Sequence, residues 1–345
     1  MMEIRKTVLA EGIPSIYAVS LAEAGGRPCC IAASEERDGE TLLVDCETEE
    51  VFPLPGSPGG VMAFVPAAGE SAVLSIESFF PVFDSAGARI VKTVLHRREG
   101  GISAERQILT QAPYVHRIAL LQEEDGAYLA AGILCRRKAR SDDWSMPGSM
   151  QIAPYRPDAD QLTLETVYDG VFKHHAMQVR KNAAGHDDLY FGGTEGCFRT
   201  TRLKGSWVTE RILDVPTSDI ALLDLDGDGR EELAVIEGFH GDSAAVFKED
   251  GGGYRRALDL PAAFGHVLWA GTLLGAPALI VGCRAGRKEL TLYRLRPGRG
   301  GSIEIAEQTQ LDQGGAPAQI FVQEDRNMIL ATNHDTGELV KYSLS

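Results

Sequence analysis

Residues 219–238 read DIALLDLDGDGREELAVIEG, and a run of acidic residues lies there between two short apolar segments. The segments IALLDL and LAVIEG have the length and composition of buried strands, and the Asp-Gly pairs between them are typical of a tight turn. Asp224, Asp226, Asp228 and Glu232 alternate along this turn, so we expect their carboxylates to lie close together. Carboxylates at such short range repel one another unless a cation lies among them.

The spacing of these acidic residues differs from that of an EF-hand. Counting from Asp224, positions 1, 3 and 5 are aspartates and position 9 is a glutamate, as in an EF-hand loop. Position 12 is Val235 instead of a bidentate glutamate, and the flanking segments are strands instead of helices. We predict a strand–loop–strand unit that binds Ca²⁺, and the alternative is a solvated acidic turn without an ion. The predicted ligands are Asp224, Asp226, Asp228, the carbonyl of Arg230, and Glu232.

Together with the following GDSAAVFKEDGGGYRR, this stretch resembles one repeat of the FG-GAP/VCBS family. The shared pattern is D-x-D-G-D-G-x-x-E between two strands, then G-x-x-x-x-V-F and a glycine-rich turn, and it covers residues 219–256. Repeats of that family form the blades of β-propellers, and the cation in the loop is structural. The resemblance therefore implies a propeller with a structural Ca²⁺.

If residues 219–256 form a blade, similar units should recur roughly every 40–50 residues. Each candidate unit starts with an apolar segment, followed by a turn and a second apolar segment. The first segments begin at Ile16, Val61, His116, Ala176, Ile220, Val267 and Gln319. Candidate outer strands are RIVKTVL (89–95), WVTERIL (207–213) and IEIAEQT (303–309). The pattern indicates seven blades.

The last unit has no room for a fourth strand, because it ends at ELVKYSLS. An additional segment, EIRKTVL at residues 3–9, precedes the first unit and matches RIVKTVL at 89–95. We interpret it as the outermost strand of the last blade, which would leave no open sheet edge. The predicted fold is an all-β, seven-bladed β-propeller over residues 1–345 as a single domain, with the last blade closed by the N-terminal strand. A stacked β-solenoid is the alternative.

The composition and net charge of the chain limit the classes of partner that it is expected to bind. The 345 residues include 34 Lys and Arg against 49 Asp and Glu, a net charge of −15, which argues against binding to nucleic acid or an anionic membrane. The sequence contains neither a secretory signal nor a run of about 18 apolar residues. Six cysteines are scattered without the spacing of a disulfide framework. We expect a cytoplasmic protein with reduced thiols.

Histidines concentrate at one end of the predicted ring. In a propeller, the loops that enter the innermost strands and those between second and third strands open on the same face, here called the mouth. Six of the eight histidines fall in these loops: His116, His174, His175, His240, His266 and His334. A single histidine is more often structural than functional, but six at one mouth favour a functional cluster. The acidic loop opens on the opposite face, so its cation is expected to be structural.

Basic residues concentrate in two loops on the mouth face. CRRKARSDDW (135–144) contains Arg136, Arg137, Lys138 and Arg140, and GCRAGRKEL (282–290) contains Arg284, Arg287 and Lys288. Such runs are often only solvated surface, but in a chain of charge −15 they favour an anionic substrate bound by guanidinium groups. Trp144 lies in the longer loop, where it either stacks on a sugar ring or belongs to a disordered lip.

These residue types suit β-elimination from an anionic or keto sugar. The reaction needs a cation beside the carboxylate or keto group, a base for the C–H proton and an acid for the leaving oxygen. We expect His116, His174, His175 and His266 to be the acid–base or metal-binding set. The expected substrate-binding set is Arg136, Arg137, Lys138, Trp144, His240, Arg284, Lys288 and His334. Seven-bladed sugar lyases and dehydratases, with His-lined and sometimes metal-containing mouths, are similar in architecture.

Two alternatives stay open. The first is a propeller that binds a glycan or a protein without turnover, as FG-GAP repeats do in adhesion receptors. The second is a metal-dependent hydrolase, in which three mouth histidines bind Zn²⁺ with an open position. No serine-hydrolase, P-loop or dinucleotide-binding motif occurs in the sequence. We expect a small-molecule or oligosaccharide substrate, a structural Ca²⁺, and either arginine or a divalent metal as the positive charge at the mouth.

Overall fold

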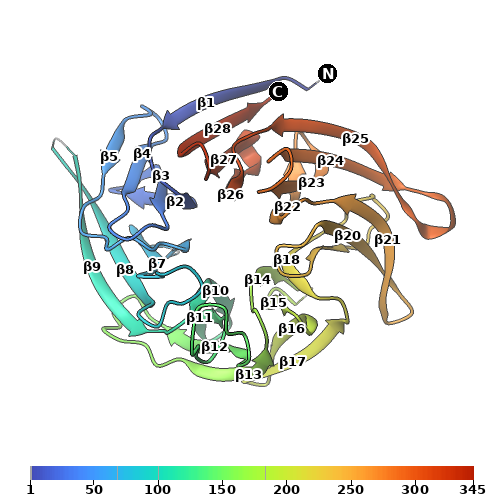
Figure 1. The fold of residues 1–345 in the computed structure, drawn as a ribbon, viewed down its shortest axis with the longest axis horizontal. Coiled ribbons are helices and arrows are strands. Elements are labelled where there is room, and N and C mark those ends of the chain that lie inside the picture. The colour runs from blue at the N-terminus through green and yellow to red at the C-terminus, as the bar shows by residue number, and fades with distance from the viewer. Residues whose placement is uncertain (1, 68, 100, 183) are drawn as a thin grey trace.

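The computed structural model describes residues 2–67, 69–99, 101–182 and 184–345. Seven four-stranded antiparallel sheets are arranged as blades around a central axis (Figure 1). In the described residues, the only helices are two single-turn 3-10 helices, and neither is long and apolar enough to cross a membrane. The predicted all-β propeller with seven blades is confirmed.

Each blade runs from an innermost strand at the axis to an outermost strand at the rim. Blade 1 contains β2 (Ile16–Ala24), β3 (Arg27–Ser34), β4 (Thr41–Asp45) and β5 (Val51–Pro53); blade 2 contains β6 (Ala63–Pro66), β7 (Ala72–Glu77), β8 (Arg89–Arg98) and β9 (Gly101–Gln111). Blade 3 contains β10 (Val115–Glu123), β11 (Gly126–Ile133), β12 (Gly148–Tyr155) and β13 (Glu165–Val171); blade 4 contains β14 (Ala176–Lys181), β15 (Asp187–Gly193), β16 (Gly196–Leu203) and β17 (Ser206–Leu213). Blade 5 contains β18 (Thr217–Leu223), β19 (Glu232–Glu237), β20 (Ser243–Asp250) and β21 (Gly253–Pro261); blade 6 contains β22 (Gly265–Leu273), β23 (Ala276–Cys283), β24 (Leu290–Pro297) and β25 (Ile303–Asp312). Blade 7 contains β26 (Pro317–Gln323), β27 (Met328–Asn333), β28 (Glu338–Leu344) and the N-terminal strand β1 (Ile4–Ala10).

The ring closes as the sequence predicts. Strand β1 pairs antiparallel with β28, from Ile4 opposite Leu344 to Ala10 opposite Leu339, and completes blade 7 (Figure 1). One interpretation needs correction, because RIVKTVL at 89–95 belongs to the third strand of blade 2 and not to its outermost strand. Residues 89–95 of β8 are mostly buried, whereas β1 is half-buried or exposed, so similar sequences occupy different depths in the two blades.

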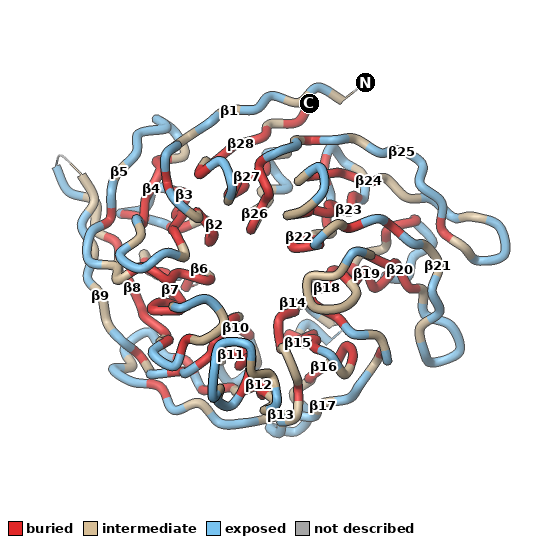
Figure 2. The backbone as a smooth tube through the Cα atoms, viewed as in Figure 1, coloured by how far each residue is buried: buried red, intermediate tan, exposed pale blue. Residues whose placement is uncertain are grey.

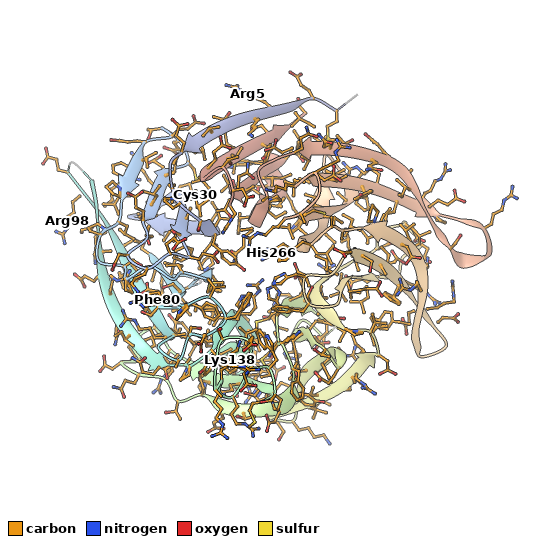
Figure 3. The ribbon with its side chains drawn as sticks, viewed as in Figure 1. Arg5, Cys30, Phe80, Arg98, Lys138 and His266 are labelled. Atoms are coloured by element: carbon orange, nitrogen blue, oxygen red, sulfur yellow. The ribbon has the colours of Figure 1, made fainter. Side chains whose placement is uncertain are left out.

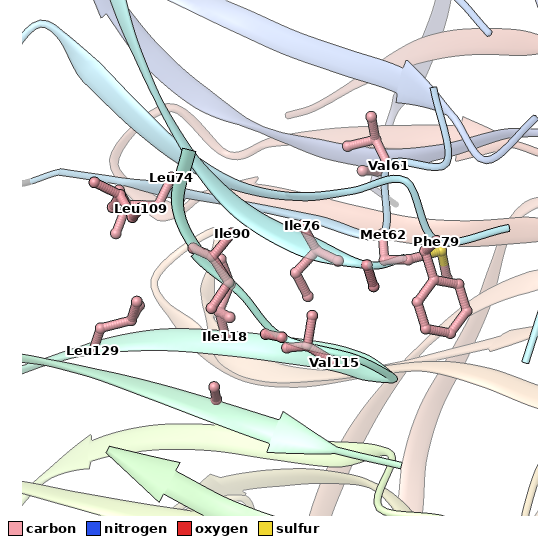
Figure 4. Close-up of a cluster of buried hydrophobic side chains, with 14 of the residues drawn as sticks. Val61, Met62, Leu74, Ile76, Phe79, Ile90, Leu109, Val115, Ile118 and Leu129 are labelled. Atoms are coloured by element: carbon pink, nitrogen blue, oxygen red, sulfur yellow. The ribbon is translucent and has the colours of Figure 1, made fainter. Parts of the chain in front are cut away.

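The core lies between neighbouring blades. Buried residues follow the inner strands, and the outermost strands are largely exposed (Figure 2). Between blades 2 and 3, Leu74, Ile76 and Ile90 pack with Ile118 and Leu129 (Figure 4). Full burial of such a side chain contributes roughly 1.5–3 kcal/mol. Because both faces of a blade are covered, β7 is buried at every position and lacks the alternation typical of a half-exposed strand.

Five innermost strands carry a β-bulge at the same position, their second residue. The residues without a partner in the strand register are Tyr17, His116, Ser218, His266 and Ala318. In four of these blades the residue just before the innermost strand has a left-handed backbone, namely Ser15, Tyr114, Phe264 and Ala316. A bulge bends its strand and changes the direction of the extra side chain. The repeated bulge therefore shapes the axial end of each innermost strand at the mouth.

Candidate active site at the mouth of the ring

Four histidines from four different blades meet at the mouth. The ring centroids lie 4.4 Å apart for His116 and His175, 4.6 Å for His175 and His240, and 4.9 Å for His240 and His266. His266 lies near the middle of the ring of blades in Figure 3. The predicted convergence of these four side chains is therefore present in the structure.

Backbone carbonyls of the bulges orient two of these rings. Nδ1 of His175 lies 2.7 Å from the carbonyl oxygen of Ser218, and Nδ1 of His266 lies 2.7 Å from that of Ala318. In both pairs the acceptor is the bulged residue of the next blade. A carbonyl can only accept, so Nδ1 carries the proton in each ring and Nε2 keeps its lone pair.

Three of the histidines form a group with the geometry of a metal site. His175, His240 and His266 each offer a ring nitrogen, and these three atoms lie within 4.8 Å of one another. Nε2 of His175 and Nδ1 of His240 are buried without a hydrogen-bond partner among the described residues, and Nε2 of His266 lies 3.3 Å from the hydroxyl of Tyr17. Unpaired buried nitrogens are costly, and a divalent transition metal would satisfy them. Three imidazoles suit Zn²⁺ and similar ions.

All four histidines are neutral in this environment. Burial lowers the pKa of His240 to about 3 and holds the pKa values of His116, His175 and His266 well below the usual range. The positive charge of Arg117 lowers the pKa of each of these groups further. A neutral imidazole is the form that binds a metal or accepts a proton.

A cavity of about 290 Å³ opens beside the cluster. Its lining consists of Tyr17, Glu35, Met62, Val82, Phe83, His240, Phe264, His266, Arg284 and Asp335. A second cavity of about 250 Å³ lies along the innermost strands, where it is lined by Arg117, Gln178, Asp219, Trp269 and Gln319 among others. His266 contributes to the walls of both cavities. The first is close to the lower limit of typical small-molecule pockets.

Some of the charged side chains at the first cavity already have an ion-pair partner, and one does not. Nε2 of His334 lies 2.9 Å from Oε1 of Glu35, and Lys288 forms an ion pair with Asp335. Arg284, in contrast, forms no ion pair with any residue in the described part of the chain. Of the predicted substrate-binding cations, Arg284 is therefore the one that lines the cavity without a carboxylate partner, while Lys288 and His334 are held by acidic neighbours at its rim.

His174 lies outside the cluster, contrary to our expectation. Its Nδ1 lies 3.2 Å from the carbonyl oxygen of Ser149, and its ring packs beside Phe191 with the centroids 5.2 Å apart. Consecutive side chains of an extended segment point to opposite sides, so His174 enters the space between blades 3 and 4 when His175 faces the axis. Burial lowers the pKa of His174 to about 4, and its surroundings are those of a structural residue.

Only some side chains of the long loop of blade 3 lie at the mouth. Trp144 lies beside Phe83 and Phe239, with centroids 6.0 and 5.6 Å away, and Nζ of Lys138 lies 3.5 Å from the centre of the Trp144 ring. Arg136 instead pairs with Asp169 on the outermost strand β13, at 2.6 Å.

The position of Arg136 corrects our expectation that it faces the mouth. It lines a different cavity, of about 510 Å³, between blades 2 and 3. Arg137 is exposed to solvent. Neither guanidinium lines the cavity beside the histidines.

Several residues at the site were missed in the sequence. Tyr17 is the second residue of its innermost strand, like His116 and His266, so aligning the starts of the blades would have identified it. Arg117 follows His116 directly and lines the second cavity. Glu35 lies in a short loop, and no periodic signal identifies it.

The acidic loop lies between β18 and β19, at the end of blade 5 that is remote from the mouth. Carboxylate oxygens of Asp224, Asp226 and Glu232 lie within 4.8 Å of one another, as predicted for a cation site. Arg230 is exposed at the tip of this loop. Binding of Ca²⁺ there stays a prediction.

Comparison with known proteins identifies the fold alone. No family model matches the chain, and no curated protein matches its sequence. Similar solved structures are a putative 6-phosphogluconolactonase from Bacteroides uniformis (14% identity, 88% of this chain and 90% of that chain, TM-score 0.56), Sqt1 from Saccharomyces cerevisiae (13%, 96% and 85%, 0.54), and the holo form of the PQQ domain of pyranose dehydrogenase from Coprinopsis cinerea (9%, 99% and 97%, 0.53). At these identities the similarity extends to the architecture and not to the chemistry.

Proposed function

We propose that this chain is a divalent-metal-dependent carbon–oxygen lyase or dehydratase, which acts on an anionic or keto sugar at the mouth. The observation that carries the proposal is the convergence of His175, His240 and His266, whose ring nitrogens lie within 4.8 Å of one another. These three residues would hold the metal and leave a position open toward the cavity. The metal would draw electron density from the carboxylate or keto oxygen of the substrate, which acidifies the neighbouring C–H bond.

The lining of the cavity supports a sugar of this kind. Arg284 is available to pair with a carboxylate, for which a guanidinium is well suited. Phe83 and Phe264 line the same cavity, and Trp144 packs against Phe83, so aromatic faces surround the opening. A volume of about 290 Å³ suits one sugar unit, either free or at the end of an oligosaccharide.

Tyr17 and Glu35 are the side chains at this cavity that would transfer protons. Oε1 of Glu35 is held by His334, and the carboxylate would accept the proton from the C–H bond as the C=C bond forms. The C–O bond breaks, and the hydroxyl of Tyr17 would donate its proton to the leaving oxygen. Burial raises the pKa of Tyr17, so this proton is retained at neutral pH. His116 does not line the cavity, and we assign it a supporting role behind His175.

The wider setting of the protein is part of the same proposal. We assign blade 5 to the FG-GAP/VCBS type, since its acidic loop joins the first two strands of a blade as in that family. Each of the six cysteines is a free thiol, which is consistent with the cytoplasm as the working compartment. The expected partner is a small-molecule or oligosaccharide substrate.

The test is ultraviolet absorbance during incubation with uronate-containing di- and oligosaccharides and with keto sugars. Metal-stripped and metal-reloaded protein would be compared, beside His240→Ala and the control His186→Ala. His186 lies in the first-to-second-strand loop of blade 4, at the end of the blade remote from the mouth, and contacts Glu123 and Glu124 of blade 3. We expect a new conjugated C=C signal that needs the metal, is lost in His240→Ala and persists in His186→Ala.

A different result would favour binding without turnover. The aromatic rim formed by Phe83, Trp144 and Phe239 would also suit a propeller that only recognises a glycan. If no substrate yields a product under any metal condition, while glycan binding is the same in His240→Ala and the unmodified protein, the lyase proposal fails and the binding function replaces it.

A further inference from the structure

A lysine side chain lies inside the acidic loop of blade 5. Lys248 belongs to β20, the third strand, and reaches across to the loop between the first two strands. Its Nζ lies 2.6 Å from Oδ2 of Asp226, 2.6 Å from Oδ2 of Asp228 and 3.5 Å from Oε1 of Glu232. One ammonium group therefore contacts three of the carboxylates that we assigned to a Ca²⁺ site.

This ion-pair group is shielded from water. The side chain of Lys248 is 13% exposed, and those of Asp226 and Glu232 are 0% exposed. Burial opposes the charge on Lys248, but its hydrogen bonds to Asp226 and Asp228 outweigh this and raise its pKa. A shielded ion pair with several hydrogen bonds is much more costly to break than a surface pair.

The loop keeps its shape by its own hydrogen bonds. The two carboxylate oxygens of Asp224 accept from the backbone N–H groups of Gly227 and Gly229, at 2.8 and 2.9 Å. Oε2 of Glu232 accepts from the N–H of Leu225, at 2.7 Å. These contacts, together with the ammonium of Lys248, hold the carboxylates together.

The ammonium and a calcium ion would compete for nearly the same position. Calcium binds carboxylate oxygens at roughly 2.3–2.6 Å, close to the distances between Nζ of Lys248 and its two aspartate partners. The loop fits calcium in its donor atoms, because Asp224, Asp226 and Glu232 are close together and Oε1 of Glu232 is buried without a hydrogen-bond partner within the described chain. The loop leaves no position for calcium, however, because the ammonium of Lys248 already lies among these oxygens.

We propose that Lys248 is a built-in cation of blade 5, which excludes Ca²⁺ from the loop and makes the propeller independent of calcium. Three carboxylates contact one ammonium, and the carboxylate of Asp224 lies beside two of them, so the loop stays negative and would bind Ca²⁺ once the lysine is removed. In this chain the acidic pattern of the repeat is kept, but an ion pair within the blade takes the place of the metal.

The test compares calcium binding and thermal stability in three proteins: the unmodified chain, Lys248→Met and Lys181→Met. Lys181 is a matched control, because it pairs with Asp187 at the first-to-second-strand loop of blade 4, and its side chain is 64% exposed. In calorimetric titrations with CaCl2, we expect Lys248→Met to bind at least tenfold more tightly than the other two proteins. Calcium prefers oxygen ligands, so the histidines at the mouth should not contribute to this signal.

Thermal unfolding gives the second readout. The Tm of the unmodified protein should be equal in chelator and in millimolar CaCl2. The Tm of Lys248→Met should fall by roughly 5 °C or more in chelator and recover in CaCl2, since removing the lysine leaves buried carboxylates unpaired. Adding Asp226→Asn to Lys248→Met should abolish the calcium response and thereby locate it in the loop.

Two results would overturn the proposal. One is equally tight calcium binding by the unmodified protein and Lys248→Met, since the ammonium would then not exclude the ion. The other is the absence of any calcium response in a folded Lys248→Met variant. If Lys248→Met does not fold, Lys248→Gln replaces it. The unmodified protein also provides a test of its own, because a rise in its Tm of more than about 2 °C on adding CaCl2 would contradict calcium independence.

Discussion

Nδ1 of His175 donates a hydrogen bond to the carbonyl oxygen of Ser218, which lies 2.7 Å away in the next blade. Ser218 is the extra residue of a β-bulge, so its carbonyl is available to a side chain instead of to the strand ladder. His266 and Ala318 repeat this relationship between blades 6 and 7, two blades further along. The bulges thus fix two rings with Nε2 as the unprotonated nitrogen of each, which is the form that binds a metal and the basis of the proposed site.

The first prediction concerns substrate affinity. Arg284→Gln should raise KM by roughly 10- to 100-fold for a carboxylate-bearing substrate, because the loss of one charged hydrogen bond costs about 1.5–3 kcal/mol. Steady-state kinetics on the best substrate checks this. Arg136→Gln is the matched control, since Arg136 pairs with Asp169 away from the axis. Equal effects of the two substitutions would show that Arg284 has no particular role at the mouth.

The second prediction concerns the pH dependence of stability. Burial raises the pKa of Asp219 to about 6, and its carboxylate accepts hydrogen bonds from the N–H groups of Ile220 and Leu268. A folded-state pKa above the unfolded value of about 3.9 means that stability is fully present below pH 4 and lost as the pH rises through 6. The unmodified protein should therefore gain stability relative to Asp219→Asn on going from pH 7.5 to pH 5.

Asp219 lines a cavity, and water there screens its charge, so we expect a relative gain of about 1 kcal/mol. Urea unfolding of both proteins at the two pH values measures this difference, and the titration of the histidines cancels between them. A constant difference between the two proteins across this range would mean that Asp219 ionises normally in the fold.

The third prediction concerns ring closure. Deletion of residues 4–10 removes β1 and exposes the edge of β28, including part of the surface around Tyr342. The free energy of unfolding should fall by about 3 kcal/mol or more, and the variant should associate through the open edge. Denaturant unfolding and gel filtration measure both effects.

A point substitution distinguishes the contribution of strand pairing to stability from that of the ion pair formed by β1. Lys6 pairs with Asp312 at 2.8 Å, and Lys6→Ala removes that partly exposed ion pair but keeps β1. We expect a loss of less than about 1 kcal/mol. If Lys6→Ala is as destabilising as the deletion, the strand itself contributes little to closure.

The order of the strands could be predicted from the sequence because each innermost strand is a short apolar segment that begins after a turn. Ile16 and Ala176 are the first residues of β2 and β14, as expected. Strand β6 begins at Ala63, two residues after the predicted start. The depth of RIVKTVL was misassigned because apolar strands alternate in the same way in third and outermost positions, and only packing between blades distinguishes them.

The histidine cluster could be predicted in part, since His116, His175 and His266 lie at or next to the start of the innermost strands of blades 3, 4 and 6. His240 comes instead from the loop between the second and third strands of blade 5, which opens on the same face. The direction of each side chain could not be predicted, because it depends on the bulges, and these leave no simple signal in the sequence. His174 and His175 are neighbours in the chain, yet one packs between blades and the other faces the axis. The position of Arg136 depends on the path of a long loop, which periodicity does not determine.

The most direct test of the central claim is anomalous diffraction from crystals of the protein grown with Zn²⁺ or Mn²⁺. We predict one ion per chain at the mouth, bound by ring nitrogens of His175, His240 and His266 at roughly 2.0–2.2 Å. The same crystals of His240→Ala should lack it. A metal-saturated crystal with no ion among these three rings would contradict the account.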